Sequence, residues 1–214
     1  MVGVGKSKLE LKKLYNYICI LFKKYDINFI PFYGTLLGIT RNNDFIEMDD
    51  DIDILVSRYY HDKIKEIIEK ENIISKFHGT WEKNDSNNTN EQNDIIQLFI
   101  NGLGPIDIYF YDILGVDLLI KWDGNLLFET KHIFPLKKYK FKDLEITRPS
   151  NPDKILKSIY GKDYLIPKKK YEYDWKKYVR TKDLNKIGGR LKISKKNKKI
   201  KKNKSKFRYL NISN

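Results

Sequence analysis

Cysteine, histidine and long apolar runs are scarce in this chain of 214 residues. Cys19 is the only cysteine, so no intrachain disulfide can form, and a reducing compartment is the simplest assumption. No segment approaches the roughly 18 consecutive apolar residues of a membrane span, and the N-terminus lacks the apolar core of a signal peptide. These absences predict a soluble, cytoplasmic protein, and the abundance of lysine, asparagine and isoleucine is also compatible with a viral protein that acts in a host cell.

The histidines and a glycine-rich stretch near the N-terminus do not form recognisable catalytic or metal-binding motifs. His61, His78 and His132 lie far apart along the chain, without the spacing of metal ligands and without a nucleophile partner. The stretch GVGKS at residues 3–7 resembles the end of a phosphate-binding P-loop, but the first glycine of that motif is missing and no strand precedes it. Neither a histidine-based metal site nor a P-loop is therefore predicted.

Acidic residues are absent between Lys186 and Arg208, where 12 Lys and Arg residues gather. Removing these 12 from the 42 in the chain leaves 30 basic against 28 acidic residues, so the formal net charge of +14 describes a tail and not the body. Such a block is typically disordered and solvated, although it can also bind an anionic partner, either nucleic acid or a membrane surface. We predict a folded domain over residues 1–185 and a lysine-rich tail over 186–214.

The body has enough apolar residues to bury a core, since the chain is 41% hydrophobic and 14% aromatic. Apolar spacing, period-two alternation and turn residues together predict its elements. We expect helices over 7–25, 36–41, 59–72 and from Asn151–Pro152 to Gly161, strands over 27–33, 51–56, 95–100, 106–111, 139–141 and 144–147, and a polar loop over 82–94. These elements predict a mixed α+β body.

Four aspartates gather at the start of one predicted strand: Asp49, Asp50, Asp51 and Asp53. Carboxylates that lie this close repel one another and resist burial, so their placement requires a compensating partner. Because side chains alternate along a strand, we expect Asp49, Asp51 and Asp53 on the face opposite the core-facing apolar residues of 52–56.

A second strand offers one more carboxylate. In IDIYFYD, residues 106–112, Asp107 lies on the face opposite the core-facing apolar side chains. Two neighbouring strands of this kind can present Asp51, Asp53 and Asp107 to one point, with Asp49 close by. A hard divalent cation, Mg²⁺ or Mn²⁺, is the expected occupant because it takes oxygen ligands and neutralises the repulsion between carboxylates.

Gly34 and Thr35 lie in a strand-to-helix turn before these acids. Such turns expose backbone N–H groups at the positive end of a helix, where a phosphate can bind. Gly34 allows a ligand to approach the backbone, the Thr35 hydroxyl can donate a hydrogen bond, and Arg41 can supply charge to a diphosphate. The alternative is that Gly34 and Gly38 only permit a tight turn and that Arg41 is a surface residue.

The segment YGTLLGITRNNDFIEMDDDIDILV resembles the signature of the LicD/fukutin family, a branch of the polymerase-β-like nucleotidyltransferase fold. The family pattern has Gly-Thr-Leu-Leu-Gly, an arginine three residues later, Gly-Phe-Ile, and then Asp-Asp-Asp-Ile-Asp. This chain has Asp44 where that glycine is usual and Glu47–Met48 where Pro-Trp is common. The later segments IDIYFYD, IFPLKKYKF and PSNPDKILKSIYGKDYLIP extend the resemblance to about residues 10–167. It implies an α+β nucleotidyltransferase fold with a mixed β-sheet flanked by helices.

The resemblance also implies a phosphotransferase. Members of the family move phosphocholine from CDP-choline, or ribitol phosphate from CDP-ribitol, to a sugar. By analogy Asp51 and Asp53 would hold Mg²⁺ on the donor diphosphate, with Asp49 as a ligand or a close neighbour. Asp107 would either bind metal or accept the proton of an acceptor hydroxyl. The implied partners are a CDP-linked alcohol or nucleotide donor and a glycan acceptor, and CMP is released.

Two other hypotheses stay open at this point. An enzyme of the same fold could transfer a nucleoside monophosphate from an NTP to a sugar, a small molecule or an RNA end, and it would release pyrophosphate instead of CMP. A non-catalytic nucleic-acid-binding protein could act through the basic tail. In that case deleting residues 186–214 would abolish function, whereas Asp51→Ala would be silent.

Overall fold

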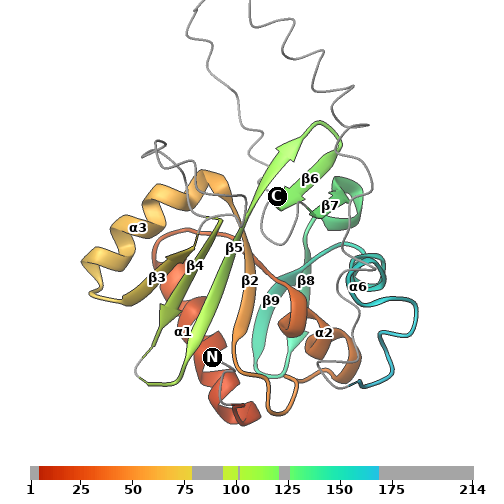
Figure 1. Ribbon diagram of the computed structural model, residues 1–214, viewed down its shortest axis with the longest axis horizontal. Helices are drawn as coiled ribbons and strands as arrows, with labels where there is room; N and C mark the ends of the chain where they lie inside the picture. Colours follow the sequence, from red (N-terminus) through yellow and green to blue (C-terminus); the bar gives the residue numbers. More distant parts are fainter. Residues whose placement is uncertain (1–4, 79–93, 101, 121–125, 169–214) are drawn as a thin grey trace, which may run out of the picture. The chain divides into compact units, whose positions relative to one another are not determined.

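The computed structural model describes residues 5–78, 94–100, 102–120 and 126–168 (Figure 1). The polar loop predicted over 82–94 lies outside the described residues except for Asp94, and the lysine-rich tail lies outside them entirely. The domain boundary predicted at residue 185 therefore stays a prediction. The described helices include none whose length and hydropathy would let it cross a lipid bilayer.

Three of the α-helices in the described part begin and end within two residues of the predicted positions, another begins three residues earlier than predicted, and the short helix at residues 130–133 was not predicted. The helices are α1 (Lys8–Lys24), α2 (Tyr33–Asn42), α3 (His61–Lys70), which a short 3₁₀ turn at Arg58–Tyr60 precedes, α5 (Thr130–Ile133) and α6 (Pro152–Tyr160). A capping box between Ser7 and Glu10 starts α1. The side chain of Asn151 accepts the backbone N–H of Lys154 at 3.2 Å, and Gly161 ends α6 with a φ of 91°.

The strands form one large sheet and one hairpin. They are β1 (Phe29–Pro31), β2 (Ile52–Ser57), β3 (Ile74–His78), β4 (Ile95–Phe99), β5 (Pro105–Leu114), β6 (Asp117–Ile120), β7 (Leu126–Glu129), β8 (Lys137–Phe141) and β9 (Leu144–Arg148). The large sheet has the order β1-β2-β5-β4-β3, and β6 joins it between β5 and β7. The β2–β5 pair is parallel, and the other strand pairs of the described part are antiparallel. The predicted mixed sheet is therefore confirmed.

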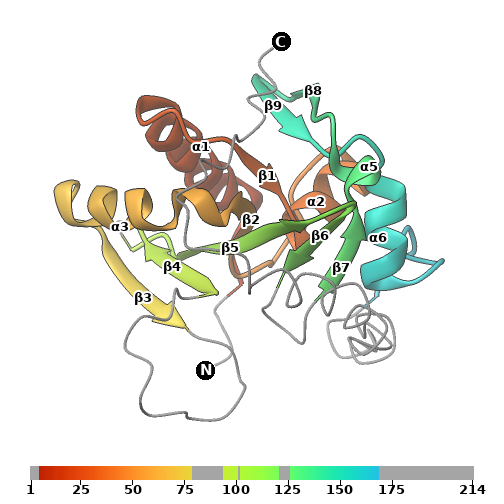
Figure 2. The same ribbon diagram turned by 90° about the horizontal axis from the view of Figure 1, so that it is seen from above.

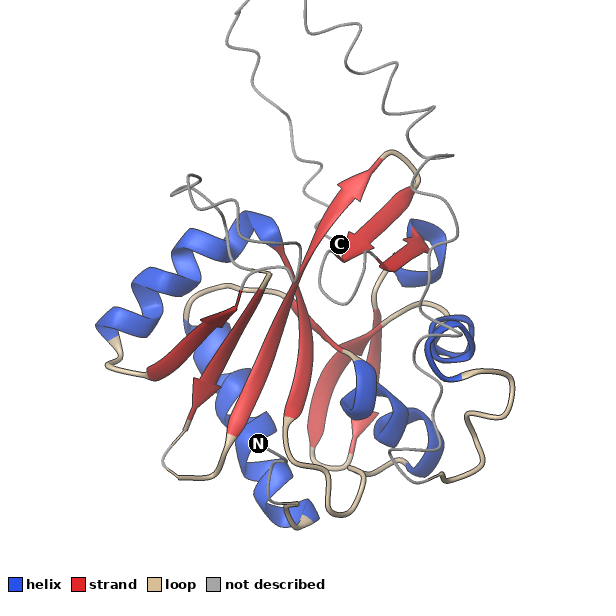
Figure 3. Ribbon diagram, in the orientation of Figure 1, coloured by secondary structure: helices blue, strands red, loops and turns tan. Residues whose placement is uncertain are grey.

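Strand β5 is long enough to pair with three other strands, with β2 and β4 along its first part and with β6 along its last part. Its residues Ile106–Tyr111 pair with β2, and its end at Tyr111–Leu114 pairs with β6. Figure 3 shows this upper part of β5 extending past β2 and β4 toward β6. The parallel β2–β5 pair holds the N-terminal ends of both strands at one edge of the sheet, and this is where the predicted carboxylates lie.

Both faces of the sheet are covered by helices, so β2 is buried on both sides. Ile52, Ile54 and Val56 pack with apolar residues of α1 and α3, whereas Leu55 packs with residues of α2 and α6. Figure 2 shows α1 and α3 together on one side of β4 and β5, away from α6. Asp53 belongs to the Leu55 face, because side chains alternate along the strand.

A buried arginine joins the opposite ends of the central strands. Arg58 is 9% exposed and pairs through Nη2 with Asp94 at 2.7 Å and through Nε with Asp112 at 2.9 Å. Arg58 follows β2, Asp94 precedes β4 and Asp112 lies in β5. The guanidinium therefore connects three strands. Removing one partner of such a pair leaves a buried charge uncompensated.

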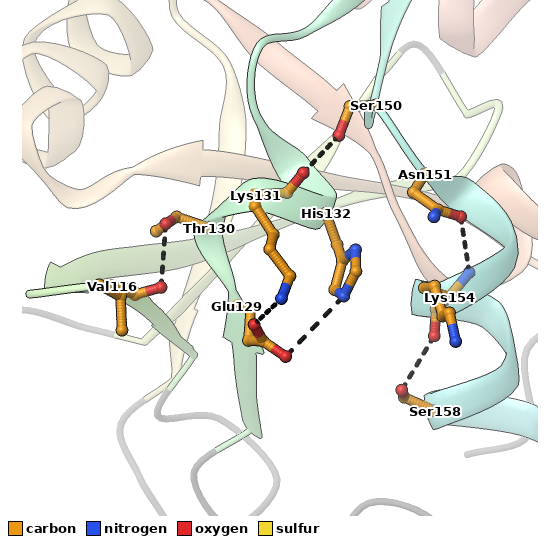
Figure 4. A network of polar contacts seen from close by, with 9 residues as sticks. All are labelled: Val116, Glu129, Thr130, Lys131, His132, Ser150, Asn151, Lys154 and Ser158. Atoms are coloured by element: carbon orange, nitrogen blue, oxygen red, sulfur yellow. Dashed lines mark hydrogen bonds and ion pairs between the residues drawn. The ribbon is translucent and has the colours of Figure 1, made fainter.

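The sequence did not predict β3, β6, β7 or α5. Figure 4 shows how the short helix α5 is fixed to its surroundings by side chains. The Thr130 hydroxyl donates to the Val116 carbonyl at 2.9 Å, and the Ser150 hydroxyl donates to the Lys131 carbonyl at 2.9 Å. Tertiary contacts of this kind stabilise four-residue elements that show no clear periodicity.

Candidate active site

Three carboxylates converge where β2 and β5 begin. One oxygen each of Asp51, Asp53 and Asp107 lies within 4.8 Å of the others. Asp53 and Asp107 occupy paired positions of β2 and β5, so their side chains extend from the same face of the sheet. These two residues are only 6% and 7% exposed. The structure thus brings together the three residues that the sequence predicts as catalytic carboxylates.

The loop before β2 adds further carboxylates. Asp49, Asp50 and Asp51 form a second group whose oxygens also lie within 4.8 Å of one another, and all three residues are partly exposed. Asp51 belongs to both groups and therefore links them. Asp49 was predicted as a metal ligand. Asp50 was not, although its place in a run of three aspartates was a signal for it.

The carboxylates of both groups act on the ionisation of Asp53. Burial raises the pKa of the Asp53 carboxyl well above its ordinary value, and the nearby charges of Asp51, Asp107 and Asp49 raise it further. The backbone N–H of Gly34 acts in the opposite direction, because it donates to the carboxylate. The site therefore favours either a proton or a cation at this point.

The first turn of α2 is bonded to Asp53. The backbone N–H of Gly34 donates to Asp53 Oδ2 at 3.0 Å, and the Thr35 hydroxyl accepts the backbone N–H of Asp53 at 2.9 Å. A Cβ on Gly34 would lie 2.7 Å from Asp49 Oδ2, so a larger residue at this position would have to displace the Asp49 carboxylate. The Gly34 N–H therefore positions the carboxylate of Asp53, and the Thr35 hydroxyl fixes its backbone. Their predicted contact with a phosphate stays a prediction.

Arg41 lies at the other end of α2, about 10 Å along the helix axis from Gly34. Its Nε donates to Asn42 Oδ1 at 3.2 Å, and its buried Nη1 makes no hydrogen bond among the described residues. A buried guanidinium nitrogen without an acceptor favours the binding of an anion. The structure does not bring Arg41 into the carboxylate groups, and its contact with a diphosphate stays a prediction.

The N-terminal segment pairs with the acidic loop. The backbone N–H of Lys6 donates to the Asp49 carbonyl at 2.8 Å, and its carbonyl accepts the N–H of Met48 at 3.0 Å. The Lys6 side chain packs against Gly104, where a Cβ would fall 2.1 Å from Lys6 Cε. Gly104 directly precedes β5. Lys6, which belongs to the segment that does not match a P-loop, therefore connects the loop before β2 to the start of β5.

Gln97 of β4 is a polar neighbour of the site that the sequence analysis missed. It pairs with Asp107 in the antiparallel β4–β5 ladder, and its Nε2 lies 3.0 Å from Asp107 Oδ1 and 3.2 Å from Oδ2. The available signal was a single amide within the apolar strand IIQLF, residues 95–99. A polar residue at such a position requires a hydrogen-bond partner.

The carboxylate groups fit a hard divalent cation. Their donors are oxygens alone, and neither group contains a histidine or a cysteine, the ligands that zinc prefers. The repulsion that raises the pKa of Asp53 is the kind of interaction that a bound cation relieves. Asp51, Asp53 and Asp107, with Asp49 beside them, are thus suited to Mg²⁺ or Mn²⁺.

The Gly-Thr turn beside carboxylates on two paired strands defines a class of protein, the transferases that have a nucleotidyltransferase domain. A family model described as LicD/FKTN/FKRP, nucleotidyltransferase domain, matches residues 26–151. Since this is more than half of the chain, the chain belongs to the LicD/FKTN/FKRP family. The resemblance and the fold inferred from the signature are confirmed, and the protein is a transferase of the phospho-alcohol or nucleotidyl type.

The matched segment contains every predicted site residue, whereas α1, Lys6 and α6 lie outside it. Among solved structures, the chain is similar to the lincosamide antibiotic adenylyltransferase LnuA bound to lincomycin, with a TM-score of 0.46 and 18% identity. That likeness covers 64% of this chain and 79% of the other. No curated protein matches the chain. The family match identifies the fold.

Proposed function

We propose that the protein transfers a phospho-alcohol group, such as phosphocholine or a polyol phosphate, from a CDP-linked donor to a glycan hydroxyl and releases CMP. The observation that carries this proposal is the convergence of Asp51, Asp53 and Asp107 on paired strands, within a family whose matched domain is a nucleotidyltransferase domain. Three acids so close together are suited to hold a cation against a phosphorylated donor.

In this proposal Asp51 and Asp53 bind Mg²⁺ or Mn²⁺, and Asp49 is a further ligand or a close neighbour. When bound, the cation neutralises the charge that develops on the bridging oxygen as CMP leaves. The N–H of Gly34 holds the carboxylate of Asp53 in place before the donor arrives, and the Thr35 hydroxyl holds the backbone of the same residue. Preorganisation of this kind supplies much of the rate in phosphoryl transfer, which depends mainly on positioning and electrostatics.

Asp107 is the third carboxylate, and it either binds the cation or accepts the proton of the acceptor hydroxyl. The two roles differ in a measurable way. As a ligand, Asp107 contributes to Mn²⁺ affinity, so Asp107→Asn weakens Mn²⁺ binding. As a base, it can be replaced by asparagine with little change in Mn²⁺ affinity, while transfer is lost.

The transfer forms one bond and breaks one. The acceptor oxygen attacks the phosphorus that carries the alcohol, and the bond from that phosphorus to the bridging oxygen of CMP breaks. The electron pair stays on CMP, and the acceptor proton passes to Asp107 or to water. Arg41 contacts the diphosphate, a role that is supported by its buried Nη1, which has no hydrogen-bond partner among the residues that the structure describes.

The experiment measures the nucleotide product with Mg²⁺ present. The protein is incubated in parallel with CDP-choline, CDP-ribitol, CDP-glycerol and CTP, each with a sugar acceptor mixture. The proposal expects CMP from one CDP-alcohol, lost in Asp51→Asn and retained in Asp143→Asn, a matched change at an exposed aspartate of the β8–β9 turn. Pyrophosphate released from CTP would instead establish nucleotidyl transfer.

A further inference from the structure

The amide of Gln97 contacts the third carboxylate of the site from the neighbouring strand. Its Nε2 donates toward both oxygens of Asp107, at 3.0 and 3.2 Å. The two residues are direct partners in the β4–β5 ladder, so the contact is fixed by strand register. Asp107 is 7% exposed, and this amide therefore replaces hydrogen bonds that water would otherwise make.

His78 of β3 lies behind this amide. Its Nε2 is 2.9 Å from Gln97 Oε1. A carboxylate only accepts hydrogen bonds, so Gln97 must turn its NH₂ group toward Asp107 and its carbonyl oxygen toward His78. A carbonyl oxygen also only accepts, so His78 must carry its hydrogen on Nε2. The three side chains thus form a chain of donors that runs from His78 through Gln97 to Asp107.

The neighbours of Gln97 give no other reason for an amide at this position. Ile95, Ile96 and Leu98 of the same strand are buried apolar residues, with exposures of 3%, 0% and 1%. An amide that extends from such a strand loses hydration, and this loss is offset only when its donor and acceptor are both bonded. The amide of Gln97 is bonded on both sides, and one of the partners is a carboxylate of the proposed active site.

We propose that Gln97 is a positioning residue for Asp107, and that His78 sets the orientation of the Gln97 amide. The amide fixes the Asp107 carboxylate, one oxygen of which lies within 4.8 Å of an oxygen of Asp51 and of Asp53. This inference rests on the proposed function in one respect, because it takes the three carboxylates as a cation site. Groups that orient a metal ligand in this way typically contribute 10- to 100-fold to metal affinity or activity.

The test measures Mn²⁺ affinity of the full chain by electron paramagnetic resonance, without donor or acceptor. Gln97→Met keeps the length of the side chain but removes both bonds, and it should weaken Mn²⁺ binding by about 10- to 100-fold. His78→Phe should weaken it by a smaller factor, and His78→Gln should retain it because a glutamine amide can still donate to Gln97 Oε1. Lys76→Met, a change at the exposed cross-strand partner of Gln97, is the matched control.

Equal Mn²⁺ affinity in the wild type and Gln97→Met overturns the proposal, and so does a wild-type protein that binds no Mn²⁺. If Gln97→Met does not fold, the two His78 variants decide, and equal affinity in His78→Phe and His78→Gln overturns the proposal. CMP release is measured on the same samples. Weakened Mn²⁺ binding in Gln97→Met, together with no CMP release by the wild type from any CDP-alcohol, would contradict the proposed function and leave the role of Gln97 standing.

Discussion

Replacing Asp53 with asparagine should stabilise the metal-free protein and abolish its stabilisation by Mg²⁺. Asp53 is buried beside Asp51 and Asp107, and burial together with these charges raises its pKa well above the ordinary value. Asparagine has almost the same shape, and its oxygen can still accept the N–H of Gly34. The substitution therefore removes repulsion while it keeps the packing.

The expected magnitude follows from the separation of the carboxylates. Two unit charges 4.8 Å apart, the upper limit for the oxygens of Asp51, Asp53 and Asp107, repel by about 3.5 kcal/mol at an effective dielectric constant of about 20. Protonation of one member of the group and access of water to Asp51 reduce the net cost. We expect Asp53→Asn to raise the free energy of unfolding by about 2 kcal/mol, or the Tm by about 4–8 °C.

The pH dependence has a definite sign. The folded pKa of Asp53 is raised, so above the unfolded value of about 4 the folded state binds more protons than the unfolded state. Stability of the metal-free wild type therefore falls as the pH rises from about 4 toward the raised folded pKa. Asp53→Asn should show a weaker fall over the same range.

The assay is thermal unfolding in EDTA and in excess Mg²⁺, each over a pH series. Mg²⁺ should raise the Tm of the wild type, because a ligand that binds only the folded state stabilises it, and it should leave the Tm of Asp53→Asn almost unchanged. A metal-free Asp53→Asn protein that is less stable than the wild type would refute the reasoning. So would an equal response of both proteins to Mg²⁺.

The remaining predictions concern a hydroxyl, an ion pair and the tail. Thr35→Val removes the acceptor of a buried N–H and should lower the free energy of unfolding by about 1–3 kcal/mol, measured by urea denaturation. Arg58→Met leaves Asp94 and Asp112 unpaired and should cost about 3–5 kcal/mol in the same measurement. Deleting residues 186–214 should leave CMP release unchanged, whereas loss of CMP release would favour a function that resides in the tail.

The carboxylates of the site could be predicted because they lie in two short segments of the sequence, residues 49–53 and 106–112. Asp53 and the strand around Asp107 follow period-two alternation, and the structure places Asp53 and Asp107 side by side as that pattern implies. The same alternation was wrong for Asp49 and Asp51, because β2 begins at Ile52 and these two residues lie in the loop before it. The cap and stop signals of α6, Asn151–Pro152 and Gly161, act within a few residues, so its boundaries were also predicted correctly.

The parts that could not be predicted depend on contacts between distant segments. Gln97 faces Asp107 only because β4 and β5 pair in a particular register, and Lys6 meets Asp49 only because the N-terminal segment folds back on the acidic loop. Strands β6 and β7 and helix α5 have four residues each, too few for a clear period. The sequence suggested that Gly34 and Thr35 lie in a turn before a helix, but α2 already starts at Tyr33. Their hydrogen bonds with Asp53 were therefore not predicted.

The most direct test of the proposed reaction asks which phosphorus of the donor is attacked. The donor is the CDP-alcohol from which the protein releases CMP, and it is hydrolysed in ¹⁸O-enriched water with Mg²⁺. The products are examined by ³¹P NMR, because ¹⁸O shifts the resonance of the phosphorus to which it is bonded. Attack at the phosphorus of the alcohol predicts ¹⁸O in the phospho-alcohol, unlabelled CMP, and no reaction in Asp51→Asn. Label in the nucleotide would contradict the account and show that the carboxylates of β2 and β5 direct nucleotidyl transfer.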